Sequence, residues 1–309
     1  MTDTLSTPPE LHDWTSMLPS ELLAHIFVHL IALHPRNRVQ YHQHGWSRPV
    51  HRTSWVYSAT HVCRRWRSTA LNSPIVWSRL FLDMHSAWEI FVQRSESALL
   101  RVEGLCYSGL AVARFPFLHE QRHRIRELNL SDLTSTHLPS LIPILVNPFP
   151  QLEVLSLQGR WAPGEAHLMR LPDKLLPDIL PDLRRLDLAG IDFVYGASSL
   201  SLKELYIRNS EVLPGLWHAT DVPAMLAALS QMPALRILHL GLSPPLEPQS
   251  EGDDINASLS YLQELDLSGD APTCRQIRAH LALPATARCT DHASELEALV
   301  STFQAHLSV

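Results

Sequence analysis

The fold can be predicted from the stretch Leu183-Arg184-Arg185-Leu186-Asp187-Leu188. Its apolar spacing, L-x-x-L-x-L, occurs five more times along the chain. The first positions of successive copies lie 27, 31, 19, 33 and 27 residues apart. Six copies at such intervals indicate a repeated structural unit. The other copies, two of which carry one isoleucine, are Ile125–Leu130, Leu152–Leu157, Leu202–Ile207, Leu235–Leu240 and Leu262–Leu267.

Each copy predicts a short strand, with its second and third leucines in a shared core and the alternating residues on the opposite face. One repeat cannot bury its own leucines, whereas stacked neighbours can. The intervals bracket the period of leucine-rich repeats, so we predict a curved solenoid with a parallel sheet. Its predicted further parts are returns at 135–146, 172–180 and 222–232, a first strand near Val102, a last strand at 285–290 and a covering helix at 295–307.

The outward-facing strand residues are candidates for binding a target protein. Tyrosine and arginine are enriched at protein interfaces, so Tyr206, with Glu204 and Arg208 beside it, is the best anchor candidate. A solvated strand face without a partner is the alternative interpretation. The candidate target-binding residues are Glu127, Asn129, Arg185, Asp187, Glu204, Tyr206, Arg208, His239, Glu264 and Asp266.

The N-terminal part of the chain predicts helices. After a polar tail at 1–15, a helix is expected over 18–30, with Pro19 in its first turn and Glu21 near its positive end. Residues 31–53 predict a long exposed loop. A second apolar stripe then runs from Val56 to Ala70, and a short third piece spans 75–80. The stripe of the first helix consists of Leu22, Leu23, Ile26, Phe27 and Leu30.

Residues 18–80 resemble the F-box motif, in the Leu-Pro-x-Glu-Leu-Leu start at 18–23 and the Val-Cys-Arg-Arg-Trp-Arg centre at 62–67. The chain as a whole resembles the F-box/leucine-rich-repeat proteins of fungal type. The resemblance implies an α+β chain, in which an all-α F-box unit precedes an α/β leucine-rich-repeat solenoid. The implied parts are a disordered tail at 1–15, an F-box domain at 16–81 with a loop insertion at 31–53, a linking helix at 82–98 and a repeat domain at 99–309.

The resemblance also implies a function. An F-box binds an acidic Skp-family adaptor that bridges to a cullin, so the chain would be a non-catalytic substrate-recognition subunit of an SCF-type E3 ubiquitin ligase. Physics agrees, because so small a helical unit needs a partner's groove to cover its apolar residues. The implied adaptor-binding residues are Leu18, Pro19, Leu22, Leu23, Ile26, Val62, Cys63, Trp66 and Leu80.

The loop at 31–53 is longer than the usual motif has. This departure keeps a second hypothesis open, in which the chain is a leucine-rich-repeat interaction scaffold that has no ligase role.

Charge and cysteine usage bear on the partners and the compartment. Between His34 and Arg79 there are eight arginines and no acidic residue. Because these arginines are interleaved with predicted core positions, they favour an acidic protein partner over nucleic acid. The four scattered cysteines and the absence of a secretory signal indicate a reducing compartment, cytoplasmic or nuclear. No apolar run approaches the ~18 residues of a membrane helix, so no membrane partner is expected.

His119-Glu120-Gln121-Arg122-His123 matches H-E-x-x-H, the zinc-peptidase signature, and gives a remote alternative, a zinc hydrolase. The run leads within two residues into the strand predicted at Ile125, which leaves no long helix to carry both histidines. One zincin class has its third histidine at the position of Asn129. We therefore expect no catalytic residue, no metal site and no cofactor, and we expect the histidines at 34, 42, 44 and 51 to be exposed loop residues.

Overall fold

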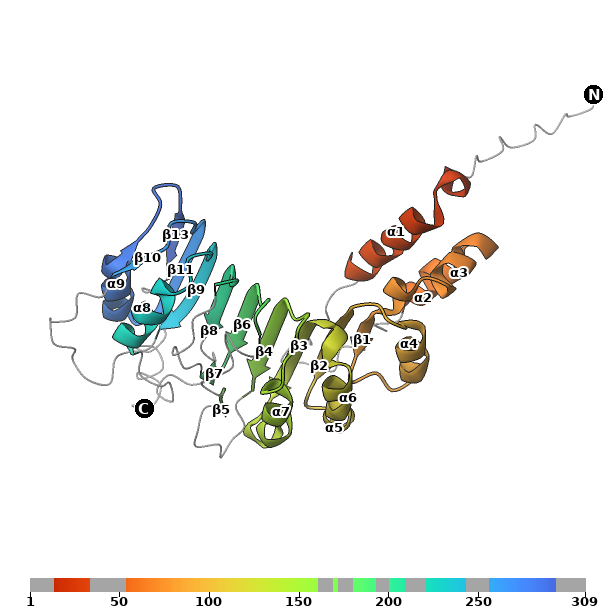
Figure 1. Cartoon of the computed structure of the whole chain (residues 1–309), viewed down its shortest axis with the longest axis horizontal. Coiled ribbons are helices and arrows are strands. Elements are labelled where there is room, and N and C mark those ends of the chain that lie inside the picture. Colours follow the sequence, from red (N-terminus) through yellow and green to blue (C-terminus); the bar gives the residue numbers. More distant parts are fainter. Residues whose placement is uncertain are drawn as a thin grey trace, which may run out of the picture. The chain divides into compact units, whose positions relative to one another are not determined.

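The computed structural model describes residues 14–33, 54–160, 169–171, 180–192, 200–208, 221–242 and 256–292. The chain forms two compact units (Figure 1). The helical unit comprises residues 1–78 and 89–98, and the sheet unit comprises residues 79–88 and 99–309. Apart from Trp14 and Thr15, which lie in a 3-10 helix, the predicted tail at 1–15 lies outside the described residues. So do most of the loop at 31–53, the covering helix at 295–307 and all but the last residue of the return at 172–180.

The helical unit begins with η1 (Trp14–Met17) and α1 (Ser20–Leu33). The first helix thus extends three residues beyond its predicted end at Leu30, because Ile31 is buried in the core of the unit. The following elements are α2 (Ser54–Thr60), α3 (Arg64–Leu71), η2 (Pro74–Trp77) and α4 (Trp88–Arg94), which starts in the sheet unit at Trp88.

The second helical run is broken, contrary to the continuous stripe predicted from Val56 to Ala70. At Cys63 the backbone is extended, with φ −152° and ψ 170°, and the Cys63 Sγ accepts the Trp66 N–H at 3.5 Å. Cys63 therefore caps the start of α3.

Aromatic side chains far apart in sequence form the core beneath α2, η2 and α4. Trp55, Trp77 and Phe91 are all buried. Their ring centroids lie 5.0 to 5.9 Å apart in edge-to-face geometry, the arrangement that the ring quadrupoles favour. Arg94 donates to the Leu71 carbonyl at 2.9 Å. These contacts place α4 from Glu89 onward in the helical unit, although residues 79–88 before it belong to the sheet unit.

The sheet unit contains a nine-stranded parallel sheet in the order β1-β2-β3-β4-β6-β8-β9-β11-β13. All six L-x-x-L-x-L copies contribute a strand, and the strand predicted near Val102 is β2. Strand β1 belongs to this sheet, so the compact sheet unit begins at Arg79, inside the residues predicted for the F-box domain at 16–81. The strands are β1 (Arg79–Phe81), β2 (Leu100–Leu105), β3 (Ile125–Leu133), β4 (Val154–Gly159), β6 (Arg185–Ala189), β8 (Glu204–Arg208), β9 (Ile237–Leu242), β11 (Glu264–Gly269) and β13 (Arg288–Asp291).

Two short parallel pairs accompany the sheet, β5 (Met169–Arg170) with β7 (Ile191–Asp192) and β10 (Ala257–Ser258) with β12 (Leu281–Ala282). Helices connect the strands, as predicted for the returns at 135–146 and 222–232. In Figure 1, α5, α6 and α7 lie together beside β2, β3 and β4. The helical connections are α5 (Gly109–Ala113), α6 (Phe115–Glu120), η3 (Arg122–Arg124), η4 (Ser135–His137), α7 (Leu138–Leu145), α8 (Val222–Ser230) and α9 (Ala271–His280).

The second and third apolar positions of every copy are buried, which confirms the prediction that they face a shared core. Apolar residues of the helices, such as Leu141, Met225 and Ile277, are buried too. Since a register slip of one residue would expose a whole leucine row, this burial fixes the alignment of the strands. The chain is therefore α+β, with helices at the N-terminus followed by a mostly parallel sheet with helices.

Candidate functional site

Apolar side chains are exposed on one part of the helical unit. Leu22 and Ile26, one helical turn apart on α1, are 52% and 45% exposed, and Val62, just before α3, is 58% exposed. Pro19 and Cys63 are also exposed, while Leu18 and Trp66 are half-buried. We call these seven residues the apolar face.

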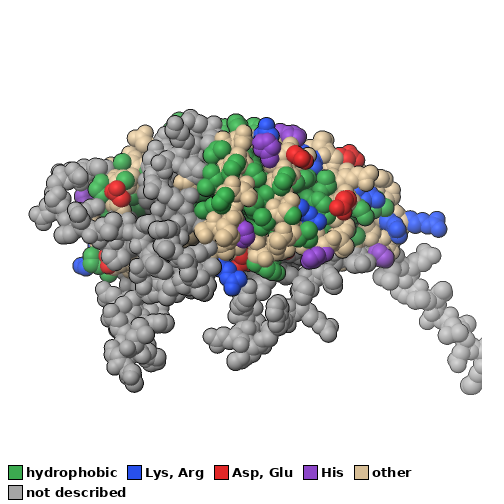
Figure 2. Space-filling model, turned by 90° about the horizontal axis from the view of Figure 1, so that it is seen from below, with side chains coloured by type: hydrophobic (Ala, Val, Ile, Leu, Met, Phe, Trp, Pro, Cys, Tyr) green, Lys and Arg blue, Asp and Glu red, His purple; other side chains and the backbone are tan. Residues whose placement is uncertain are grey.

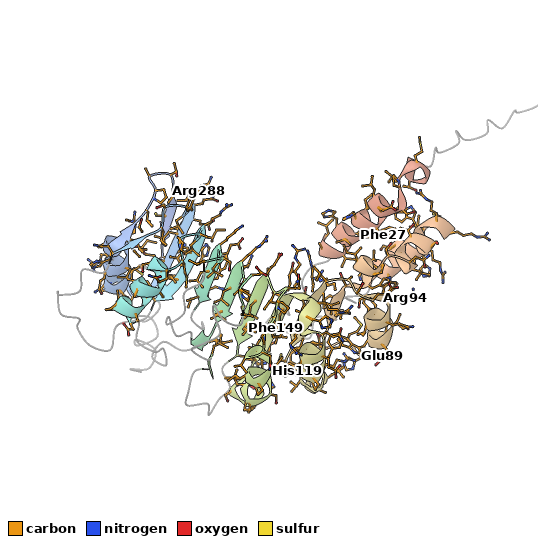
Figure 3. All side chains as sticks on the ribbon, viewed as in Figure 1. Phe27, Glu89, Arg94, His119, Phe149 and Arg288 are labelled. Atoms are coloured by element: carbon orange, nitrogen blue, oxygen red, sulfur yellow. The ribbon has the colours of Figure 1, made fainter. Side chains whose placement is uncertain are left out.

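Polar contacts hold the two parts of the apolar face together. The Arg65 guanidinium donates to the carbonyls of Thr15 and Leu18. Trp66 Nε1 donates to Thr15 Oγ1 at 3.0 Å, and Trp66 meets Phe27, which extends from α1 toward α3 (Figure 3), at a centroid distance of 5.2 Å. The start of α3 is thereby fixed beside the start of α1.

Two predicted adaptor-binding residues are not on this face. Leu23 is fully buried inside the helical unit. Leu80 is fully buried in β1 of the sheet unit, where it pairs with Val102. A fully buried side chain cannot contact a partner unless its own core opens, so we correct the role of both leucines from contact to core.

Other exposed hydrophobic residues lie on several elements, and in the helical unit they include Met17 beside Leu18, Leu33 at the end of α1 and Ile75 in η2. Ile90 lies on α4, Tyr107 follows β2, Val146 follows α7, and Tyr261 precedes β11. In the view of Figure 2, hydrophobic side chains are interspersed with charged and histidine side chains. Single exposed apolar residues are ordinary in globular proteins, whereas a group held together is typical of an interaction site.

The register of the sheet aligns the predicted target-binding residues in rows across the strands. The third positions of the copies pair from β3 to β11, and so do the fifth positions. Arg208 lies in a further row, paired with Ala189. The third-position row is Glu127, Val154, Arg185, Glu204, Ile237 and Glu264, and the fifth-position row is Asn129, Ser156, Asp187, Tyr206, His239 and Asp266.

Of the ten predicted target-binding residues, eight form one connected polar cluster on β6, β8, β9 and β11. Arg185 lies over the Tyr206 ring, with its guanidinium carbon 4.6 Å from the ring centroid, and the rings of Tyr206 and His239 lie 4.7 Å apart. His239 Nε2 is 2.9 Å from a carboxylate oxygen of Glu264. The members of the cluster are Arg185, Asp187, Glu204, Tyr206, Arg208, His239, Glu264 and Asp266.

Ion pairs organise the cluster around a buried carboxylate. Asp187 accepts from Arg208 at 2.5 Å, and Arg185 lies 3.7 Å from its second oxygen. Burial, together with the nearby Glu204 carboxylate, raises the pKa of Tyr206, so the phenol keeps its proton and can donate a hydrogen bond at neutral pH. The cluster therefore presents a fixed tyrosine between charged neighbours, which suits a protein interface.

Glu127 and Asn129, the other two predicted residues, do not join the cluster. They lie on β3, and the buried Ser156 of β4 separates Asn129 from Asp187 in the fifth-position row. Glu127 instead pairs with Arg101 of β2 at 3.2 Å.

The sequence analysis missed a further row, formed by the second positions of the copies. These residues lie at the start of a strand or just before it. A prediction based on alternating residues within the strands therefore does not include them. Each of the later five donates its backbone N–H to the carbonyl of the member before it, at 2.7 to 2.8 Å. The second-position row is Arg126, Glu153, Arg184, Lys203, Arg236 and Gln263.

The H-E-x-x-H run does not lie on one helix. Helix α6 ends at Glu120, and His123 lies in η3 after the break at Gln121. His119 is exposed on α6 (Figure 3), and its carbonyl accepts a hydrogen bond from Arg122 at 2.7 Å. Among the residues that the structure describes, no group of three or more histidines, cysteines and carboxylates is placed to hold a metal ion. In the same residues no helix has the length and apolar character to cross a membrane.

Comparison with protein families adds one finding. Residues 15–83, which span α1, α2, α3, η2 and β1, match the F-box-like family model. No curated protein and no solved structure matches the chain.

Proposed function

Because residues 15–83 carry an F-box-like domain, we propose that the chain is the substrate-recognition subunit of an SCF-type E3 ubiquitin ligase. In this proposal the helical unit binds a Skp-family adaptor, and the adaptor links the chain to a cullin. The sheet unit binds the target protein. The chain itself catalyses nothing and needs no cofactor, since holding the target near a charged enzyme supplies the rate gain.

The exposure of the apolar face is the observation that supports adaptor binding most strongly. Leu22, Ile26 and Val62 stay exposed although the unit has a well-packed core beneath them. A second polypeptide that covered them would bury apolar surface at about 25 cal/mol per Å². The same face is where the family resemblance places its contacts, apart from the two buried leucines.

Charge around the apolar face fits the same partner. On α3, Arg64 and Arg67 are exposed, and neither α2 nor α3 contains an acidic residue. An acidic adaptor would be attracted to this surface, which would speed the encounter and make it sensitive to salt.

We propose further that the sheet unit is a leucine-rich-repeat solenoid and that its polar cluster contacts the target. The buried second and third apolar positions of all six copies and the parallel pairing support this architecture. The cytoplasm and the nucleus are the compartments we propose, since four cysteines that form no disulfide fit a reducing compartment.

Isothermal titration of the full chain with a purified Skp-family adaptor tests the proposal. We expect Ile26→Asp to weaken adaptor binding by about 30-fold or more, the effect of losing an interface hot spot of about 2 kcal/mol. Ile90→Asp is the matched control, because Ile90 is 49% exposed in the same unit but lies outside the family match. The proposal fails if the folded wild-type chain does not bind the adaptor, or if both variants weaken binding equally.

A further inference from the structure

The second-position row is a continuous ladder at the edge of the sheet where the strands begin. Its backbone hydrogen bonds run without interruption from Arg126 to Gln263, one residue per strand. Parallel strands lie about 4.7–4.9 Å apart, so the row repeats at that interval.

Neighbouring side chains of the row lie on the same side of the ladder. The Glu153 carboxylate is 2.8 Å from Arg126 Nη2 and 3.9 Å from Arg184 Nη2, and these are the members before and after it. Arg236 is exposed and Lys203 is half-buried. Within the described residues, neither Lys203 nor Arg236 is in an ion pair. Of the three successive cations Arg184, Lys203 and Arg236, only Arg184 therefore has a described carboxylate partner, Glu153.

Charge changes sign between this row and the fifth-position row. On β6, β8, β9 and β11, the fifth-position row holds Asp187 and Asp266 and no arginine or lysine. The fifth position follows the second by three residues, which corresponds to about 10 Å along a strand. The row at the start of these strands is thus basic, whereas Asp187 in the fifth-position row is buried and already paired with Arg208 and Arg185.

We propose that this basic row binds an α-helix of the target protein that lies across the strands, with a stripe of acidic side chains against Arg184, Lys203 and Arg236. The inference rests on the proposed function, because it names the kind of target segment that the sheet unit would select.

The spacing of the row favours a helix over an extended segment. Helical residues three or four apart rise about 4.5–6 Å along one face, which matches the interval between strands. Residues on one face of an extended chain repeat at about 6.4–6.8 Å and fall out of step with the cations after two strands. A helix can therefore place one carboxylate opposite each of the three cations.

Fluorescence anisotropy with labelled synthetic peptides and the full chain tests this inference. The probe is a lactam-stapled helical peptide with glutamates at i, i+3, i+7 and i+10. One comparison peptide has the same composition and staple with the glutamates dispersed around the helix, and another keeps the glutamate positions but has a central proline and no staple. We expect the striped helix to bind about tenfold more tightly than either and to lose affinity as salt rises from 50 to 300 mM, roughly the range over which screening becomes strong.

Matched charge variants locate the binding surface. Lys203→Gln/Arg236→Gln should weaken binding of the striped helix about tenfold, as expected for losing two charge pairs. Arg275→Gln/Arg278→Gln, which removes two exposed arginines from α9, should change it less than about twofold. Equal binding of the dispersed or proline peptide overturns the helical assignment, and equal loss in both double variants overturns the assignment to this row.

The same samples separate this inference from the proposed function. Lys203→Gln/Arg236→Gln should leave adaptor affinity unchanged, because both residues belong to the sheet unit. If the adaptor binds but the striped helix does not, only the helix-binding inference fails. If the striped helix binds and the adaptor does not, the proposed ligase role fails while the charged row remains a helix-binding surface.

Discussion

Gly269, at the end of β11, illustrates how a single residue fixes the sheet. Its φ is +122°, and a Cβ built there would lie 1.9 Å from the Leu242 carbonyl oxygen of the neighbouring strand. The Leu242 carbonyl also accepts the Asp270 N–H at 3.1 Å, so the two strand ends are held closely together. Only glycine fits this position without strain.

Gly269→Ala should therefore destabilise the chain by more than about 1 kcal/mol, since the native backbone cannot accommodate the new methyl group. Gly109→Ala is the control, because a Cβ at Gly109 in α5 meets no atom within 4 Å. Alanine there should be neutral or stabilising by up to about 1 kcal/mol. Urea unfolding curves of the two variants measure the difference, and equal midpoints would contradict the steric argument.

The cysteines give a second test at the residue scale. Cys63 and Cys289 are exposed, whereas Cys106 and Cys274 are buried. Burial raises the pKa of Cys106 to about 12 and that of Cys274 to about 11, so little reactive thiolate forms at either site near pH 8. Iodoacetamide should alkylate Cys63 and Cys289 first, as mass spectrometry of peptides would show.

Adaptor binding should then slow alkylation of Cys63 and leave Cys289 unchanged. Cys63 lies on the apolar face, while Cys289 lies on β13 of the sheet unit and serves as the internal control. An unchanged rate at Cys63 in the saturated complex would show that the adaptor does not cover the start of α3.

At the scale of elements, α4 completes the helical unit. The F-box-like match ends at residue 83, yet the aromatic core takes Phe91 from α4. Phe91→Ala should cost about 3–5 kcal/mol, because it empties a packed aromatic site. Its exposed neighbour gives the control, and Ile90→Ala should stay within about 0.5 kcal/mol. Thermal unfolding followed by tryptophan fluorescence compares them; similar melting of the two variants would mean that α4 is not part of this core.

Sequence patterns predicted the strands better than the helices. The leucine spacing predicted the strand of every copy, because each strand buries its leucines against the neighbouring strands in the same way. The break at Cys63 was missed because cysteine is not among the usual capping residues. Strand β1 was missed because its three residues continue the apolar pattern of the preceding helical segment, and only the pairing of Leu80 with Val102 distinguishes them.

The same reasoning explains what was predicted of the candidate site. Alternation placed nine of the ten proposed target-binding residues in two rows, because side chains in a strand point to opposite faces in turn. Which of them would touch depended on the register between strands 19 to 33 residues apart, and no local pattern records that register. Whether a residue of the apolar stripe of α1 is exposed, as Ile26 is, or buried, as Leu23 is, likewise depends on tertiary packing.

At the scale of the whole molecule, the chain passes between its two units three times, after Ser78, after Trp88 and after Ala98. Trp88 packs against Phe117 and Arg114 of the sheet unit, while Phe91, three residues later, packs in the helical unit. The boundary between the two compact units therefore falls inside α4, between Trp88 and Glu89.

This interleaving has a consequence for proteolysis. A nick between Ser78 and Arg79 would produce two fragments, and the longer one would still carry α4 with its buried Phe91. The shorter fragment would remain bound to the longer one, because Trp55 and Trp77 pack against Phe91 of α4. Severing one peptide bond would therefore not release the piece that carries the apolar face from the piece that carries the polar cluster.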